Sequence, residues 1–196
     1  MNLSYVIKKG AEIESIFEDL ALLRIAVFKA YPYLYEGSLD YEKEYLSTYF
    51  KSEKSFLFAV YHNKQMVGAT TCIPLADETD EVQQPFAQAG WDMNAIFYFG
   101  ESILLPEYRG LGLGHRFFDE REAHARNFGT FKTTCFCAVV RPDNHPLIPE
   151  NYRSLDDFWT KRGYQKTPSV QSQFEWVDIG ETVSTFKPMV YWMRHW

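Results

Sequence analysis

One glycine-rich segment constrains the fold of this chain more than any other feature of the sequence. Glycines alternate with larger residues in Arg109-Gly110-Leu111-Gly112-Leu113-Gly114. A strand-like apolar run over residues 96–105 precedes the segment, and a helical pattern over residues 113–128 follows it. Glycine lets the backbone turn sharply and approach a ligand closely, and the N-terminus of a helix attracts anions. The sequence therefore predicts a strand, a phosphate-binding turn and a helix in succession.

Two common nucleotide-binding motifs do not fit this segment. A dinucleotide-binding fingerprint would need a glycine where His115 stands, and a P-loop would need a Gly-Lys-Ser or Gly-Lys-Thr that the sequence lacks. What remains is an Arg-x-x-Gly-x-Gly turn. The guanidinium of Arg109 adds a fixed cation with several donors beside the expected phosphate.

The rest of the chain has the pattern of a mixed α/β protein. Helices are predicted over about residues 13–27, from a cap at Ser38 through Tyr49, and over residues 82–89 and 154–162. Strands are predicted over residues 4–8, 55–61, 66–73, 133–140, 174–178 and 189–196, with a hairpin between the second and third of these. A length of 196 residues fits one domain that covers the whole chain, residues 1–196.

Charge and residue usage exclude several classes of partner. The net charge is −6 and no run of Lys or Arg is present, which argues against nucleic acid and against binding to a membrane. The sequence has neither a signal-peptide pattern at its start nor an apolar run of ~18 residues, so we expect a cytoplasmic protein. The cysteines lie in apolar stretches and the histidines lack paired ligand spacing, so we expect neither disulfides nor a metal site.

The turn from Arg109 to Gly114 resembles the acyl-coenzyme A (acyl-CoA) pyrophosphate loop of the GNAT superfamily of N-acetyltransferases. The order of the expected elements is similar to that superfamily over nearly the whole chain, and residues 158–164 resemble its late helix, which ends in a glycine followed by an aromatic residue. The resemblance implies an α/β fold with a mixed, twisted central sheet and helices on both faces. The sheet would be splayed between two parallel strands, the one ending at Leu105 and the one beginning at Thr133.

The same resemblance implies acetyl-CoA as the co-substrate. Backbone groups near Leu104 would hold the pantetheine arm, and the amides of Leu111, Gly112, Leu113 and Gly114, with Arg109 and Gly110, would bind the pyrophosphate. The family's pantetheine-binding asparagine normally lies seven residues before a tyrosine of the late helix. Counting back from Trp159, which stands at that tyrosine's position, gives Tyr152, so Asn144 is the candidate substitute.

Glu101 is the candidate general base. An amine with a pKa near 10.4 is protonated at neutral pH, so a group must remove its proton before it can attack a thioester. Glu101 follows Gly100, and a glycine inside a strand often marks a bulge that redirects a side chain. Strand alternation puts Glu101 on the face of Phe97, Phe99 and Ile103, where burial would raise its pKa. The alternative is a structural carboxylate bonded to backbone or to an arginine.

The sequence offers several candidates for the residue that donates a proton to the leaving thiolate. Because Trp159 replaces the tyrosine that the family often uses, Tyr152 is the first candidate acid, with Tyr164 and His145 behind it. A thiol pKa near 8.5 also makes the thiolate a tolerable leaving group without an acid. The segment 141–153 looks like an insertion that walls the acceptor pocket. Candidate acceptor contacts are Tyr31, Tyr33, Tyr35 and His145, and a packed aromatic corner is the alternative for the tyrosines.

We therefore expect acetyl transfer from acetyl-CoA to the primary amine of a small molecule, by a monomer or homodimer without a metal. Two alternatives stay open. In one, the acceptor is the amine of a protein or peptide. In the other, the chain is a non-catalytic sensor that binds acyl-CoA, which the missing tyrosine of the late helix would favour.

Overall fold

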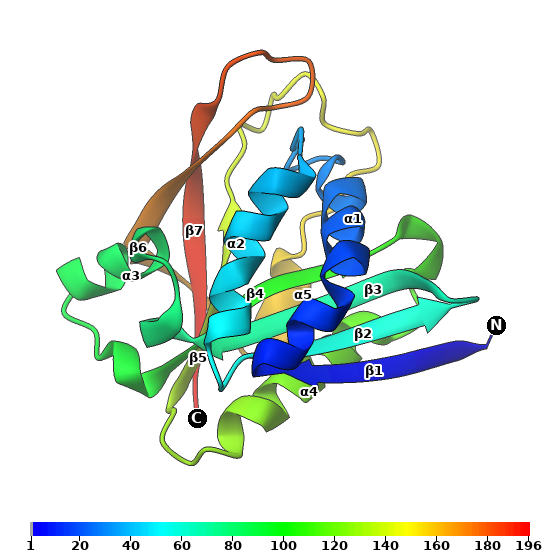
Figure 1. Cartoon of the computed structure of the whole chain (residues 1–196). Helices are drawn as coiled ribbons and strands as arrows, with labels where there is room; N and C mark the ends of the chain where they lie inside the picture. The colour runs from blue at the N-terminus through cyan, green and yellow to red at the C-terminus, as the bar shows by residue number, and fades with distance from the viewer. Residues whose placement is uncertain (1) are drawn as a thin grey trace.

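The computed structural model describes residues 2–196, which form a seven-stranded sheet with helices on both faces (Figure 1). The strands are β1 (Leu3–Lys9), β2 (Phe56–His62), β3 (Gln65–Pro74), β4 (Ile96–Leu104), β5 (Thr133–Val139), β6 (Gln165–Trp176) and β7 (Thr185–His195). Their order across the sheet is β1-β2-β3-β4-β5-β7-β6, and neighbours are antiparallel except β4 and β5, which are parallel. The mixed sheet expected from the sequence is confirmed.

Within the described residues, five α-helices cover the sheet, with three on one face and two on the other. Helices α1 (Phe17–Phe28), α2 (Leu39–Lys51) and α3 (Asp80–Gln88) pack on the first face, and α4 (Leu113–Arg126) and α5 (Asp156–Lys161) on the second. Short 3₁₀ turns lie at Gly10–Ile16, Leu75–Asp77, Met93–Ala95 and Pro106–Tyr108. Figure 1 shows α1 and α2 in front of the sheet and α4 behind it.

The sheet opens between β4 and β5. These strands pair only over Ile96–Tyr98 and Thr133–Cys135, although β4 runs on to Leu104 and β5 to Val139. On its other edge β4 stays paired with β3 along most of its length. The two parallel strands therefore diverge at their C-terminal ends, as the GNAT resemblance implied, and the glycine-rich turn follows the β4 end of the opening.

A bulge in β4 accompanies the opening. Thr70 of β3 pairs with Ser102, but Cys72, two residues on, pairs with Phe99, so β4 contains one extra residue at Gly100–Glu101. Gly100 is needed there because a Cβ atom would lie 1.9 Å from the hydroxyl of Tyr49. The bulge predicted from this glycine is confirmed.

Several element boundaries differ from the sequence predictions. The first helix begins as a 3₁₀ turn and becomes α-helical only at Phe17, and the late helix covers only Asp156–Lys161. The last two strands both begin earlier in the chain than predicted. For β6 the reason is that the strand is largely exposed, so its polar residues masked its strand character. The hairpin of β2 and β3, the Ser38 cap of α2 and the helix within residues 82–89 are confirmed.

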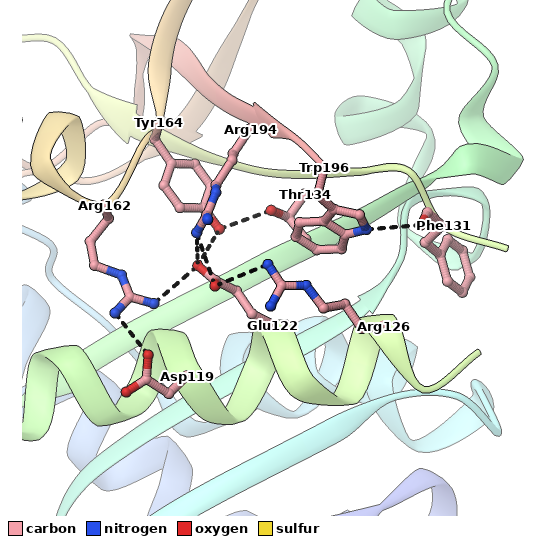
Figure 2. A network of polar contacts seen from close by, with 9 residues as sticks. All are labelled: Asp119, Glu122, Arg126, Phe131, Thr134, Arg162, Tyr164, Arg194 and Trp196. Carbon is pink, nitrogen blue, oxygen red and sulfur yellow. Dashed lines mark hydrogen bonds and ion pairs between the residues drawn. The ribbon is translucent and has the colours of Figure 1, made fainter. Parts of the chain in front are cut away.

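A buried carboxylate on α4 fixes that helix to the far side of the sheet (Figure 2). Glu122 accepts from Arg162, at the end of α5, and from Arg194, on β7, at 3.1 and 3.0 Å. The hydroxyl of Tyr164 donates to the same carboxylate at 3.3 Å and is also bonded to Thr134 of β5. This network holds α4, whose N-terminus carries the glycine-rich turn, against α5 and β7.

Candidate active site

The glycine-rich turn is an open loop at the start of α4. Gly110 and Gly112 have φ angles of +77° and +79°, a region that other residues adopt only at a cost. A Cβ atom on either glycine would meet no atom within 4 Å, so the turn borders open space. The side chain of Leu111 is exposed, whereas Leu113 is buried and anchors the first turn of the helix.

The backbone amides of this turn are available to a ligand. The amides of Tyr108 and Arg109 close the preceding 3₁₀ turn by bonding to the carbonyls of Leu105 and Pro106, at 3.0 and 3.1 Å. Within residues 2–196, the amides from Gly110 to His115 donate to no backbone carbonyl. Unpaired amides at a helix N-terminus attract a negatively charged group. The geometry therefore fits a pyrophosphate, and the exposed Arg109 stands beside it.

A small cavity lies near the bulge of β4, on the face covered by α1 and α2. Its volume is about 90 Å³. Most of its wall is aromatic, with a single arginine and a single carboxylate among the lining side chains. The lining side chains used below are Arg24, Tyr33, Tyr35, Tyr45, Glu101 and Trp176.

Glu101 is the carboxylate of this cavity. Only 3% of the residue is exposed. Its Oε2 lies 2.7 Å from Nη1 of Arg24 and accepts a hydrogen bond of 3.4 Å from the hydroxyl of Tyr45. Its Oε1 has no partner in the described part of the chain. Burial raises the pKa of Glu101 above its ordinary value, and the charge of Arg24 opposes part of that rise.

The face on which Glu101 lies corrects the sequence expectation. Simple alternation placed it with Phe97 and Phe99, but those rings belong to the core on the opposite face, under α4. Glu101 instead shares the face of Tyr98 and Ile103. The physical reason is the bulge, because one extra residue in a strand of period two moves the following side chains to the other face.

The tyrosines after α1 divide into two groups. Tyr33 and Tyr35 line the cavity. Tyr31 is not among the lining residues and packs against the rings of Tyr152 and His145, with centroid distances of 4.7 and 5.7 Å. The structure thus places Tyr31 in an aromatic corner beside the other two.

The remaining sequence candidates lie at different places around the opening. Leu104 ends β4 beyond its last pair with β5, and Asn144 is exposed in the segment between β5 and α5. Tyr152 is half-exposed in that same segment. Tyr164 is buried in the core under α4 and is bonded to Glu122 and Thr134, so it is on the opposite face of the sheet from Glu101.

Sequence reasoning missed Arg24, which pairs with Glu101, and Glu42, which pairs with the same arginine. Arg24 of α1 bonds both Glu101 and Glu42 of α2, and all three side chains are buried. The helical pattern of the sequence did contain a signal for Arg24. Arg24 comes four residues after Leu20 and three before Val27, so it is a charge on the apolar stripe of its helix.

The structure thus brings together a parallel pair of strands that diverge, a glycine-rich turn with free amides after the first of them, and a buried carboxylate beside the opening. The sequence profile of the acetyltransferase (GNAT) family matches residues 21–164. The chain therefore belongs to this family of acyltransferases, which use acyl-CoA as co-substrate, and the resemblance seen in the sequence is confirmed.

Solved structures share the fold over the whole chain. An N-acetyltransferase from Staphylococcus aureus Mu50 has a TM-score of 0.62 at 9% identity and covers 100% of this chain and 99% of its own. A ribosomal-protein-alanine N-acetyltransferase from Brucella melitensis has a TM-score of 0.59 at 11% sequence identity, and the match covers 97% of this chain and 99% of that protein. An acyl-CoA N-acyltransferase from Pseudomonas aeruginosa has a TM-score of 0.57 at 12% sequence identity, and the match covers 98% of this chain and 99% of that protein. No curated protein matches the sequence.

Two structural features are missing from residues 2–196. No three His, Cys, Asp or Glu side chains there are grouped so that they could hold a metal ion. No helix in the same range has the length and apolar character needed to cross a membrane.

Proposed function

We propose that this protein transfers the acetyl group of acetyl-CoA to the primary amine of a small molecule. The observation that carries the proposal is the unpartnered Oε1 of the buried Glu101, which belongs to a cavity of about 90 Å³ beside the opening of the sheet. A carboxylate in that position can accept a proton from an amine that enters the cavity. The family supplies the acyl donor, and the cavity suits a slender acceptor.

The glycine-rich turn is the proposed binding site for the pyrophosphate of acetyl-CoA. The amides of residues 110–114 and the side chain of Arg109 would hold it, and Leu104 and Asn144 would contact the pantetheine arm. Bound acetyl-CoA would supply a thioester carbonyl carbon for attack and a thiolate as the leaving group. The free amides at the start of α4 support this role, because they and the helix dipole both favour an anion.

Glu101 is the proposed general base, and the aromatic wall is the proposed contact for the acceptor. Glu101 takes one proton from the ammonium group, the amine nitrogen bonds to the acetyl carbon, and the carbon–sulfur bond breaks. The nitrogen then carries one proton more than the amide product, and that proton passes to Tyr152 as Tyr152 gives its own proton to the departing thiolate. Tyr33 and Tyr35 would surround the ammonium, since aromatic faces attract cations. Tyr31 and His145 would shape the adjoining wall, and Tyr152, packed on Tyr31, is the proposed proton donor to the thiolate.

Isothermal titration with acetyl-CoA tests the donor half of the proposal. We expect saturable binding, and the absence of binding at high micromolar ligand would refute it. Release of the CoA thiol in the presence of a panel of small primary amines tests the acceptor half.

Glu101→Gln tests the base. Because the side-chain amide of glutamine cannot accept the proton, we expect turnover to fall by about 10²–10³-fold while the affinity for acetyl-CoA is unchanged. Unchanged turnover in a variant that binds acetyl-CoA normally would remove Glu101 from this role.

A protein or peptide amine is the second candidate acceptor. The acidic net charge of −6 would suit a basic peptide, and the similar structure from Brucella melitensis is described as an acetyltransferase of ribosomal-protein alanine. A panel of lysine-containing and N-terminal peptides, run beside the small amines, distinguishes the two. Binding of acetyl-CoA without turnover of any amine in either panel would instead favour the sensor, which the tryptophan at position 159 allows.

A further inference from the structure

The base at the cavity belongs to a buried cluster of one cation and two carboxylates. Nε of Arg24 pairs with Oε2 of Glu42, and Nη1 of the same guanidinium pairs with Oε2 of Glu101 at 2.7 Å. The exposed fractions of the three residues are 7%, 0% and 3%. The cluster joins α1, α2 and β4, and Glu101 is the carboxylate that reaches the cavity, because Glu42 is not among the lining residues.

This cluster has an uncompensated negative charge. With both carboxylates ionised, the three side chains carry a net charge of −1 in a site that excludes water. An unbalanced buried charge is costly, so such a cluster readily accepts a proton or a cation. Oε1 of Glu42 and Oε1 of Glu101 each lack a partner within residues 2–196, so neither carboxylate is fully satisfied by Arg24.

A second buried cation, Arg121, lies near Glu101 but does not bond its carboxylate. Arg121 of α4 acts on Glu101 through its charge, but it bonds only the backbone carbonyl of that residue, at 3.4 Å, and not the carboxylate. The remaining titratable groups that act on its carboxylate or share its cavity wall are neutral hydroxyls, a thiol and one further carboxyl: Tyr33, Tyr35, Tyr41, Tyr45, Tyr49, Glu78, Tyr98 and Cys137. Arg24 is therefore the one cation bonded to the Glu101 carboxylate in the described chain.

We propose that Glu42 keeps Glu101 basic by competing for Arg24. A carboxylate alone with a guanidinium is strongly acidic and makes a poor base. Because Glu42 takes Nε of Arg24, the positive charge is divided and Glu101 holds a proton more tightly than it would in a simple ion pair. Glu42 is not among the residues that line the cavity, so it is a positioning residue that acts through Arg24.

The division of charge also suits the proposed reaction, on which this part of the inference rests. An ammonium group that enters the cavity brings a charge of +1 to a cluster of −1. When the proton moves from nitrogen to Glu101, the amine and the cluster both become neutral. The total charge of the buried site is zero before and after the transfer, so the step requires no new buried charge.

Glu42→Gln tests the proposal, because glutamine keeps an oxygen that can accept from Arg24 but has no negative charge. We expect the pKa of Glu101, followed by carbon-13 NMR of labelled carboxyl groups and assigned with Glu101→Gln, to fall by about 1 unit or more. The acid limb of the pH profile of kcat/KM should move to lower pH by the same amount, and the plateau rate should fall. An unchanged or higher pKa of Glu101 overturns the proposal.

Two controls separate this effect from others. Glu44→Gln removes the same charge from an exposed position on the same helix and should leave the pKa of Glu101 within a few tenths of a unit. If Glu42→Gln does not fold, the wild-type titration decides, because a pKa of Glu101 at or below the ordinary glutamate value of about 4.3 would contradict a divided charge. The titration needs no acetyl-CoA, so it remains decisive even if the proposed transferase activity fails.

Discussion

Glu78 is a third buried carboxyl on the side of the sheet that holds Glu101 and Glu42. It is 5% exposed and accepts hydrogen bonds of 3.0 Å from the hydroxyl of Tyr49 and from its neighbouring amide, that of Thr79. Burial raises its pKa to about 7, and the two hydrogen bonds only partly oppose the rise. In the folded protein this carboxyl is therefore protonated over a pH range in which it is ionised in the unfolded chain.

That difference makes a pH-dependent contribution to stability. Between the ordinary pKa of 4.5 and the folded pKa of about 7, the folded state binds a proton that the unfolded state lacks, so the free energy of unfolding falls as pH rises. The free energy of unfolding of the wild type should therefore fall between about pH 5 and pH 8. We expect the fall to be smaller in Glu78→Gln, by up to roughly 3 kcal/mol. Urea denaturation across that range measures the difference, with Glu44→Gln as the exposed control. Parallel curves for the wild type and Glu78→Gln would contradict the assignment.

At the scale of single residues, the sequence was informative where one local signal was sufficient. Gly100 predicted the bulge, and the bulge pointed to Glu101. Arg24 and Glu42 could not be paired from the sequence, because their contact depends on how α1 packs against α2. The face of Glu101 was wrong for a related reason, since alternation in a bulged strand fails at the residues that the bulge redirects.

At the scale of elements, the glycine-rich turn combines backbone strain with proposed ligand binding, and these can be tested separately. Alanine at Gly112 would have to adopt a φ near +79°, which costs about 1 kcal/mol, or relax and turn the neighbouring amides away. We expect Gly112→Ala to lower the affinity for acetyl-CoA at least about tenfold, measured by isothermal titration.

Gly90 offers a matched control for that substitution. Its φ is +76°, and a Cβ atom there would also meet nothing within 4 Å, but it lies after α3 and not in the turn. Gly90→Ala should therefore cost a similar amount of stability, about 1 kcal/mol, and leave acetyl-CoA binding intact. Equal affinities for the two variants would argue against a phosphate-binding role for the turn.

Elements with a strong local pattern were placed well from the sequence, and those defined by tertiary context were not. The turn and α4 were found because a strand, alternating glycines and a helical stripe adjoin in the chain. Strand β6 was underestimated because much of it is exposed and gains its strand geometry from pairing with β7. The parallel pairing of β4 with β5 was inferred only from the GNAT resemblance.

At the scale of the whole molecule, Arg141 joins three distant segments around the cavity that contains Glu101. Its guanidinium donates to the carbonyls of Pro32 and Tyr33, at 2.8 and 2.7 Å, and pairs through two nitrogens with Asp178, at 2.7 and 2.9 Å. The indole of Trp176 donates to the same Tyr33 carbonyl. Two of these segments carry cavity-lining residues, so a single side chain helps to set the shape of the cavity.

Arg141→Lys tests this connection, because lysine keeps the charge but cannot reproduce the planar fork of donors. The carbonyls and Asp178 would lose most of their partners, so we expect a loss of about 2–3 kcal/mol in urea denaturation. If the connection shapes the acceptor cavity, KM for the amine should rise several-fold while the affinity for acetyl-CoA is unchanged. Arg153→Lys, an exposed position in the segment between β5 and α5, should change neither quantity. Lower stability with an unchanged KM for the amine would mean that Arg141 supports the fold without shaping the cavity.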